Sequence, residues 1–251
     1  MPHDSVIPIV LESHGHHFYS GTGFFVYFPQ FVEDIFFVTA RHCLKNDAKD
    51  EFLGDIKISY KNSAEVGSPV LEFECFLETS YRDSEDQSLE DIIIGVVKRT
   101  TLDNHRVLKE RSLRILHQDD VDFLLEKTIE LNGNFRTLGY PGVSKEIIYD
   151  EDGLEIKGIS QSRGFYGKFK KSTLFDNWYE MTHTSWKEGE ISGFSGSPII
   201  ELIPKSAEFK EFEAVPLGLL LTEKHFISIN VVTNTIANYF VELRNEISNT
   251  V

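Results

Sequence analysis

The chain has 251 residues, of which 41% are hydrophobic, and it carries 25 Lys and Arg against 40 Asp and Glu, a formal net charge of −15. This length suits one large all-β domain or two small barrels, and the apolar content argues against disorder. The negative charge disfavours nucleic acid or an anionic membrane as a partner, because both repel an acidic surface. No run approaches the roughly 20 apolar residues of a membrane span and no apolar leader follows the start, so we expect a cytoplasmic protein.

The first half of the chain is a series of short segments rich in aromatic and β-branched residues, separated by turn-forming residues, which is typical of antiparallel strands. The expected strands cover residues 7–11, 23–28, 35–40, 55–60, 70–77 and 91–98. This series predicts a first β-barrel within residues 1–117. Residues 118–127 are expected to form a crossing linker that includes a short helical turn.

A second series of strands predicts a second β-barrel within residues 128–232. Its expected strands cover residues 128–132, 135–139, 154–164, 177–182, 197–202, 215–222 and 226–232. Over residues 233–248 apolar side chains recur at helical spacing, which predicts a C-terminal α-helix with Thr233 as its N-cap. The apolar side chains are those of Ile236, Tyr239, Phe240, Leu243 and Ile247.

A serine stands between glycines in the segment Gly193-Phe194-Ser195-Gly196-Ser197-Pro198. A nucleophilic serine needs a tight turn that exposes its hydroxyl and directs backbone N–H groups at a developing oxyanion, and glycine permits such a turn. Ser197 competes with Ser195, but only Ser195 has glycines both two residues before and one residue after. Clusters of Gly, Ser and Pro usually mark ordinary turns. The segment therefore indicates a nucleophile only in combination with segments earlier in the chain.

Two earlier segments supply the partners that such a serine needs. Residues 36–43 contain an apolar strand that leads to His42, and Asp91 stands directly before the apolar run 92–97. Among the acids in this region, only Asp91 adjoins the strand. The competing acids are Glu85, Asp86 and Glu90. The chain order His42, Asp91, Ser195 is that of the chymotrypsin-type double barrel.

In these motifs the chain resembles the trypsin-like (chymotrypsin-fold) serine peptidases, as a leaderless bacterial-type member. The family segments G-[ST]-G-F, T-A-x-H-C, D-[IL]-A-[LV], G-[YF]-P and G-x-S-G-[GS]-P are resembled, in order, within residues 21–26, 39–43, 91–94, 138–142 and 193–198. The third segment departs from the pattern, because Ile93 replaces the usual small residue. The resemblance covers roughly residues 8 to 235. It implies an all-β fold of two antiparallel six-stranded β-barrels of the chymotrypsin type with a C-terminal α-helix.

The resemblance also implies a serine endopeptidase that needs no cofactor and no metal. Ser195 attacks the substrate carbonyl, His42 moves the proton and Asp91 orients the imidazole, while the backbone amides of Gly193 and Ser195 form the oxyanion hole. Zymogen-type members have an aspartate where this chain has Phe194. Activation by N-terminal cleavage is therefore not expected, and the turn is held either by packing of Phe194 or by a bound substrate or partner.

The family's primary specificity pocket has its floor at Gly189 in this chain. The substrate-binding residues that the resemblance implies are Gly189, Glu190, Leu221, Thr222, Glu223 and Phe226. Residues 221–223 would pair with an extended substrate by strand addition. Since no acid occupies the floor, an uncharged side chain before the cut is favoured.

Other interpretations stay open beside this one. A catalytically weak or inactive binding module on the same fold is the main alternative, because Phe194 leaves the shape of the turn undecided. An α/β-hydrolase fits poorly, since that fold places its acid and histidine after the serine and only His225 follows. Cys43 and Cys75 suit a reducing compartment as free thiols, although a pairing between them is not excluded by sequence. The expected partner is a protein or peptide substrate, and a regulatory partner is left open.

Overall fold

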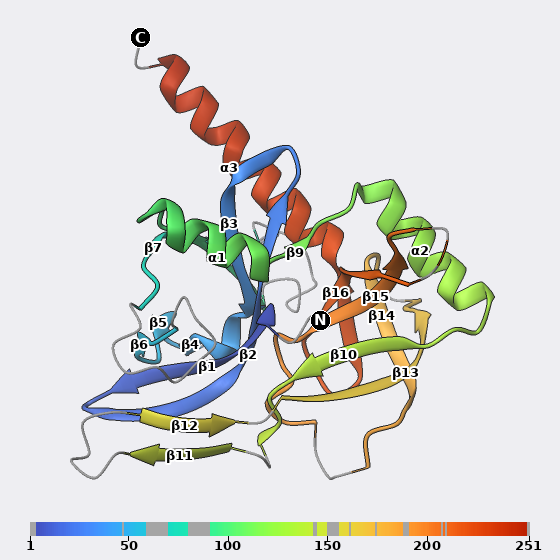
Figure 1. Ribbon diagram of the computed structural model, residues 1–251, viewed down its shortest axis with the longest axis horizontal. Coiled ribbons are helices and arrows are strands. Elements are labelled where there is room, and N and C mark those ends of the chain that lie inside the picture. The colour runs from blue at the N-terminus through green and yellow to red at the C-terminus, as the bar shows by residue number, and fades with distance from the viewer. Residues whose placement is uncertain are drawn as a thin grey trace.

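The chain folds into a half-barrel sheet followed by a closed β-barrel, and a long C-terminal helix packs against both (Figure 1). The computed structural model describes residues 4–46, 48–58, 70–79, 91–142, 145–149, 156–160, 162–173, 175–187, 191–206, 208 and 210–249. The protein is therefore mostly β with a helix at its C-terminal end, as predicted.

The first sheet has the strand order β6-β1-β2-β3-β8-β7, and β9 adds to β2 in parallel. Its strands are β1 (Val6–Ser13), β2 (His16–Phe28), β3 (Phe31–Ala40), β6 (Asp55–Ile56), β7 (Phe73–Glu78), β8 (Ile92–Val97) and β9 (Leu113–Arg114). Within the described part of the chain, the edge strands β6 and β7 do not pair with each other. The sheet is thus a half-barrel, where a closed six-stranded barrel was predicted.

Three short elements lie between β3 and the edge strand β6 in the chain. The turn that follows β3 is a single 3-10 turn, η2 (Arg41–Cys43), and a two-stranded ribbon comes next. The ribbon consists of β4 (Lys45–Asn46) and β5 (Glu51–Phe52). These elements place the residues after β3 beside the end of β7, which becomes important at the site.

The second half forms the predicted closed barrel of six strands, in the order β10-β13-β14-β17-β16-β15. Its strands are β10 (Phe135–Gly139), β13 (Arg163–Lys171), β14 (Trp178–Thr184), β15 (Pro198–Pro204), β16 (Phe212–Leu220) and β17 (His225–Ser228), with a separate ribbon of β11 (Lys145–Tyr149) and β12 (Ile156–Ser160). Aromatic rings fill its interior. Phe135 lies 6.0 to 6.1 Å, between ring centroids, from Phe165, Phe169 and Phe226, at separations typical of favourable aromatic pairs.

Two helices follow the first sheet, the first in a stretch for which no helix or strand was predicted and the second where a linker and a strand were predicted. They are α1 (Leu102–Arg111) and α2 (Gln118–Glu130). The Thr101 hydroxyl caps α1 by accepting a hydrogen bond from its first turn. α2 replaces the predicted linker 118–127, and the expected strand 128–132 is wrong. Val121 and Leu125 explain the difference, because side chains four residues apart share one face of a helix and both are buried there.

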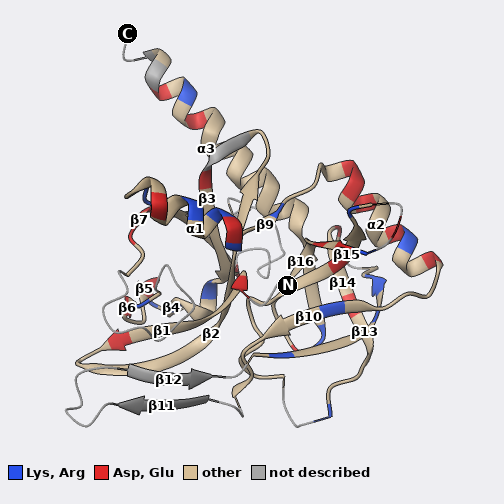
Figure 2. Cartoon of the chain, in the orientation of Figure 1, with Lys and Arg blue, Asp and Glu red and all other residues tan. Residues whose placement is uncertain are grey.

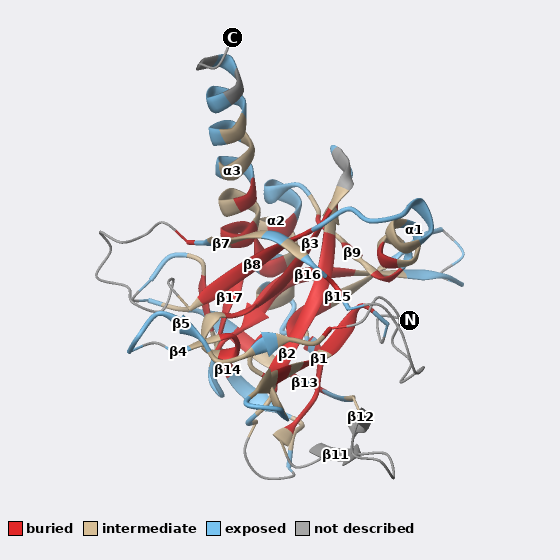
Figure 3. Ribbon diagram, turned by 90° about the vertical axis from the view of Figure 1, so that its left-hand side faces the viewer, coloured by how far each residue is buried: buried red, intermediate tan, exposed pale blue. Residues whose placement is uncertain are grey.

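The C-terminal helix α3 (Ile229–Asn249) begins earlier than the predicted residue 233. The Ser228 hydroxyl accepts a hydrogen bond from Asn230 N at 3.2 Å and so ends the strand that was expected to continue to residue 232. Thr233, the predicted N-cap, lies inside the helix and its hydroxyl donates to Ile229 O at 3.2 Å. The first turns of α3 are buried, whereas its later turns extend away from the body and are exposed (Figures 1 and 3).

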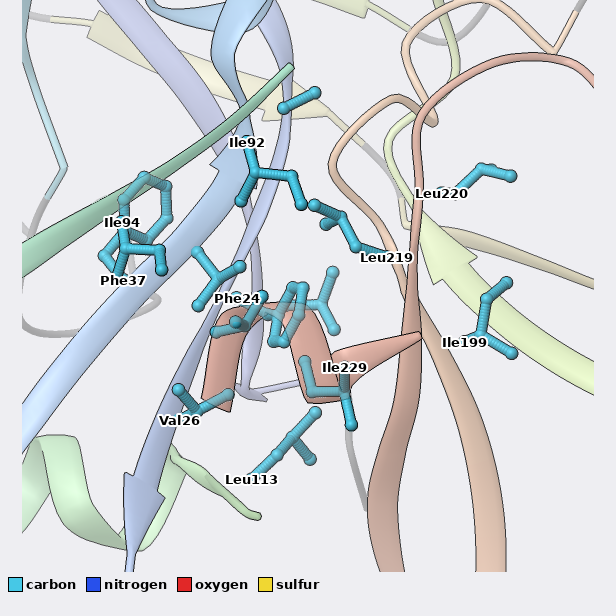
Figure 4. Packing of buried hydrophobic residues seen from close by; sticks show 14 of the residues in the cluster. Phe24, Val26, Phe37, Ile92, Ile94, Leu113, Ile199, Leu219, Leu220 and Ile229 are labelled. Carbon is cyan, nitrogen blue, oxygen red and sulfur yellow. The ribbon is translucent and has the colours of Figure 1, made fainter. Parts of the chain in front are cut away.

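One hydrophobic cluster joins the half-barrel, the barrel and α3. Figure 4 shows Phe24 and Ile92 of the first sheet together with Leu219 of the barrel and Ile229 at the start of α3. All four side chains are fully buried. Because apolar surface from both halves is removed from water together, the two halves are held in a fixed relation and can share a site at their junction.

Helix α2 carries several acidic residues (Figure 2). Asp119 and Asp120 occupy its first turn, where the positive end of the helix dipole favours negative charge. In the described part of the chain, no helix has both the length and the apolar character needed to cross a membrane.

Candidate active site

Asp91 and His42 face each other where β3 ends and β8 begins. The two strands are antiparallel neighbours with Ala40 opposite Ile92, so the residues beyond this pair are brought together. Nδ1 of His42 lies 2.8 Å from Oδ2 and 3.0 Å from Oδ1 of Asp91. The backbone N–H of His42 donates to the same carboxylate at 3.0 Å, and that of Arg41 donates to Asp91 O at 3.0 Å. A carboxylate only accepts, so Nδ1 carries the proton and Nε2 faces away from Asp91.

This contact controls the charge of the imidazole. The hydrogen bond from His42 to Asp91, followed by that with Cys43, raises the pKa of His42 above its ordinary value, although burial acts in the opposite direction. The side chains of His42 and Asp91 are 37% and 23% exposed, so the pair is open to solvent and to a ligand on one side. The carboxylate therefore favours the imidazolium, which is the form that a general base produces when it takes up a proton.

Ser195 reaches this site from the second half of the chain. Its turn lies just before β15 and touches the histidine turn, because Cys43 Sγ lies 3.6 Å from Ser195 O. The Ser195 hydroxyl donates to Leu221 O at 3.2 Å, which is its hydrogen-bond partner among the described residues. The fold thus brings the three predicted catalytic residues to one junction, with the serine hydroxyl directed at Leu221 O.

The glycines on either side of Phe194 and Ser195 are required by the backbone. Gly193 has φ +91° and Gly196 has φ +85°, conformations that L side chains rarely adopt. A Cβ at Gly193 would lie 2.6 Å from Tyr140 O, and one at Gly196 would lie 2.0 Å from Thr22 O. The glycine pattern that suggested a nucleophile turn therefore has a direct structural cause.

The peptide group that joins Ser192 to Gly193 is held by a backbone hydrogen bond. Ser192 O accepts a hydrogen bond from Gly142 N at 2.7 Å. No cis peptide occurs in the described part of the chain, and the C=O and N–H of a trans peptide point in opposite directions. The Gly193 N–H therefore points away from Gly142, and the Ser192 carbonyl is not turned into the site. Within the described residues, neither this N–H nor that of Ser195 donates to another group.

Phe194 is packed inside the protein, which agrees with the expectation that its side chain holds the turn. Its side chain is 0% exposed, and its ring meets those of Phe165 and Trp186 edge-on, each at 5.1 Å between centroids. Apolar packing thus holds the centre of the turn where zymogen-type peptidases have a charged residue.

Burial distinguishes the two serines that were candidates for the nucleophile, Ser195 and Ser197. Ser197 is 0% exposed, so its hydroxyl is closed to a substrate. A Cβ at Gly139 would lie only 2.2 Å from Ser197 Oγ, which shows how tightly that hydroxyl is enclosed. The acids that competed with Asp91 lie outside the described residues.

The predicted substrate-binding residues fall into three groups. Gly189 and Glu190 lie outside the described residues. Thr222 and Glu223 are exposed in the tight turn between β16 and β17, while Leu221 is buried. Phe226 was expected to bind substrate, but its side chain is 0% exposed. Its ring stacks on that of Tyr179, at 5.1 Å between centroids, within the barrel. Alternation along β17 turns this ring inward, so it does not form an open pocket wall.

The edge proposed for strand addition is partly engaged within the protein. Leu221 N and Thr222 N both donate to His225 O, at 3.2 and 3.3 Å. These two N–H groups are not available to a substrate unless the turn opens, so the strand addition expected at residues 221–223 would have to use other backbone groups of this segment.

Sequence reasoning missed an ion-pair network around the histidine turn. Arg41 and Lys45 flank His42, and each pairs with both Asp50 and Glu78. Only 14% and 10% of the two basic side chains is exposed. Each residue looks like an ordinary surface charge in the sequence. The sequence shows only that Arg41 and Lys45 are four positions apart. This spacing does not identify the acidic residues with which they pair.

Cys43 and Cys75 are free thiols. A Cβ at Gly21 would lie 2.4 Å from Cys43 Sγ, so Gly21 makes room for this thiol beside the site.

Comparison with models of protein families gives no match for the chain, and comparison with curated proteins finds no similar sequence. The resemblance to serine peptidases therefore depends on the motifs and on the arrangement just described.

Proposed function

We propose that the protein is a serine endopeptidase that cleaves peptide bonds through an acyl-enzyme. The observation that carries the proposal is the paired Asp91 and His42 of the half-barrel, lying beside the Ser195 turn of the closed barrel. In this proposal the two halves correspond to the two barrels of the chymotrypsin type, and the site lies at their junction.

The reaction begins when the Ser195 hydroxyl turns from Leu221 O to Nε2 of His42. Oγ attacks the substrate carbonyl carbon while His42 takes the hydroxyl proton, and Asp91 stabilises the imidazolium. The backbone amides of Gly193 and Ser195 stabilise the oxyanion, a contribution of about 10²–10³ in rate for each donor in related enzymes. The C–N bond then breaks, His42 protonates the leaving amine, and water repeats the sequence to release the acid.

Activation in this proposal does not require cleavage at the N-terminus. The burial of Phe194 between Phe165 and Trp186 supports a turn that is shaped before substrate arrives. Enzymes stabilise the transition state best with donors that are already oriented, because no reorganisation is then needed during the reaction.

A binding module on the same fold is the second candidate. One observation favours it: the Ser195 hydroxyl donates to Leu221 O and not to His42. If binding of a peptide did not release this hydroxyl, the site would hold a chain without cutting it.

The two candidates are separated by a serine-directed fluorophosphonate probe. We expect labelling of the wild type and of Ser197→Ala, whose buried hydroxyl is the matched control, and no labelling of Ser195→Ala. Labelling of Ser195→Ala to the level of the wild type would refute the proposed nucleophile. Mass-spectrometric mapping of cuts in a peptide library then tests turnover and the residue preference together.

A further inference from the structure

Thr22 lies on β2, in the half-barrel, and is 0% exposed. We propose that Thr22 is a positioning residue that holds the oxyanion turn of the other half in its working shape. The inference rests on the proposed peptidase function. Thr22 does not touch the reacting atoms, and it acts through the backbone of Gly193 and Ser195.

Every polar atom of Thr22 is engaged. Its hydroxyl donates to Gly193 O at 2.7 Å, and its N–H donates to Ser195 O at 3.0 Å. The same hydroxyl accepts from Tyr140 N at 3.0 Å, and the Thr22 carbonyl accepts from the hydroxyl of Thr39 at 2.7 Å. A hydroxyl that both donates and accepts has a fixed direction, so Thr22 holds the two carbonyls on either side of Phe194 at defined positions.

Together with a hydrogen bond between Gly142 N and Ser192 O, the Thr22 contacts fix the backbone conformation of Gly193. On one side of Gly193, the Ser192 carbonyl is bound to Gly142 N; on the other, the Gly193 carbonyl is bound to Thr22. Fixing the two planar peptide groups that meet at a residue fixes its φ and ψ. The N–H of Gly193 is consequently held in one direction at a backbone conformation, φ +91°, that has no side chain to restrain it.

Packing of Phe194 alone would not do this. Apolar contact is non-directional, and it keeps the ring buried without setting the orientation of the neighbouring peptide groups. Hydrogen bonds supply that direction. Those from Thr22 to the carbonyls of Gly193 and Ser195 act beside two within the turn, from Phe194 N to Ile191 O at 3.1 Å and from Ser197 N to Phe194 O at 2.8 Å. Thr22 and Phe194 therefore divide the task that one charged residue performs in zymogen-type peptidases.

Three variants test the role of Thr22. Thr22→Val keeps the shape but removes the hydroxyl, and Thr22→Ser restores a hydroxyl on a smaller side chain. Thr137→Val is the matched control, because Thr137 is 3% exposed and its hydroxyl donates to Pro198 O at 2.9 Å, at the start of β15 and not to a carbonyl of residues 193–195. All three are compared at equal folded fraction, measured by denaturant unfolding.

We expect Thr22→Val to lower kcat about 10-fold with KM unchanged, less than the 10²–10³ lost when a donor itself is removed. Thr22→Ser should recover most of the loss. Thr137→Val should lose stability without losing kcat. A fall in kcat for Thr137→Val equal to that for Thr22→Val would overturn the proposal, because both would then report general loosening of the buried core.

Amide hydrogen exchange gives a readout that does not depend on activity. Thr22→Val should exchange faster than wild type across residues 192–197, and Thr137→Val should not. Equal exchange in the two variants would overturn the positioning role even if turnover changed. A wild type that neither reacts with the fluorophosphonate nor cuts peptides would instead refute the peptidase function, and the exchange comparison would still decide whether Thr22 holds the turn.

Discussion

His42 Nδ1 and Asp91 Oδ2 lie 2.8 Å apart, although the two residues are 49 positions apart in the chain. Pairing of β3 with β8 causes this meeting, and the backbone N–H of His42 ties the carboxylate a second time. The imidazole thus has a defined tautomer and orientation before any ligand binds, and its Nε2 is left for another partner.

Asp91→Asn should abolish most of the activity while leaving the fold intact. The amide can donate to Nδ1 and so favour the wrong tautomer, and a loss of about 10⁴ in kcat accompanies this change in related enzymes. Steady-state kinetics on a peptide substrate measures it. Asp103→Asn is the control, since that carboxylate is 91% exposed on α1, and a comparable loss there would contradict the assignment.

Activity should rise with pH through a pKa higher than that of an ordinary histidine. The base must be neutral to accept a proton, and Asp91 raises the pKa of His42. We expect the inflection of kcat/KM above about pH 6.5, the ordinary histidine value. Replacing Asp91 with Asn should move the inflection down. An inflection at or below the ordinary value in the wild type would show that the Asp91 contact does not govern the base.

The same contact makes a contribution to stability that is lost at high pH. The folded-state pKa of His42 lies above its unfolded value, so the imidazolium contact stabilises fully below about pH 6.5 and fades as the pH rises through the folded-state pKa. Urea unfolding of wild type and Asp91→Asn across this range should give a difference that shrinks with increasing pH. A difference that grows would contradict the expected sign.

The ion-pair network should stabilise the histidine turn more than an isolated surface pair would. Glu78→Gln leaves the largely buried Arg41 and Lys45 with Asp50 alone, and we expect a loss of about 1 kcal/mol, with the 36% exposure of Glu78 limiting it. Glu72→Gln is the control, because its pair with Lys98 is more than half exposed. Denaturant unfolding at low and high salt measures both, and equal small losses would mean that the network adds nothing.

Phe194→Ala should destabilise the protein by about 3–5 kcal/mol, the usual cost of removing a fully buried phenylalanine ring. The cavity would adjoin Phe165 and Trp186 and loosen the oxyanion turn, so kcat should fall at temperatures where the variant is still folded. Phe123→Ala, at a ring 63% exposed on α2, should change neither property. Unchanged stability in Phe194→Ala would contradict the packing role.

Short-range sequence patterns were enough to predict the strands that end at His42 and begin after Asp91, and the tight turn that contains Ser195. The apolar run before His42, the run after Asp91 and the glycines around Ser195 each reflect a requirement of the neighbouring backbone. The helix α2 was missed because residues 128–132 alternate over too short a stretch to exclude a helix. Phe226 was misassigned because a sequence does not state which face of a strand points into the barrel.

Short-range patterns in the amino-acid sequence were sufficient to predict the β-rich character, the C-terminal helix and the positions where a histidine, an aspartate and a serine stand beside tight turns. These depend on short-range periodicity and on the conformations open to glycine. Three features required the folded chain: Thr22 binds the carbonyls of Gly193 and Ser195, the first sheet is a half-barrel, and the Ser195 hydroxyl points to Leu221. Such contacts join residues far apart in the chain, and their direction is set by how the two halves pack together.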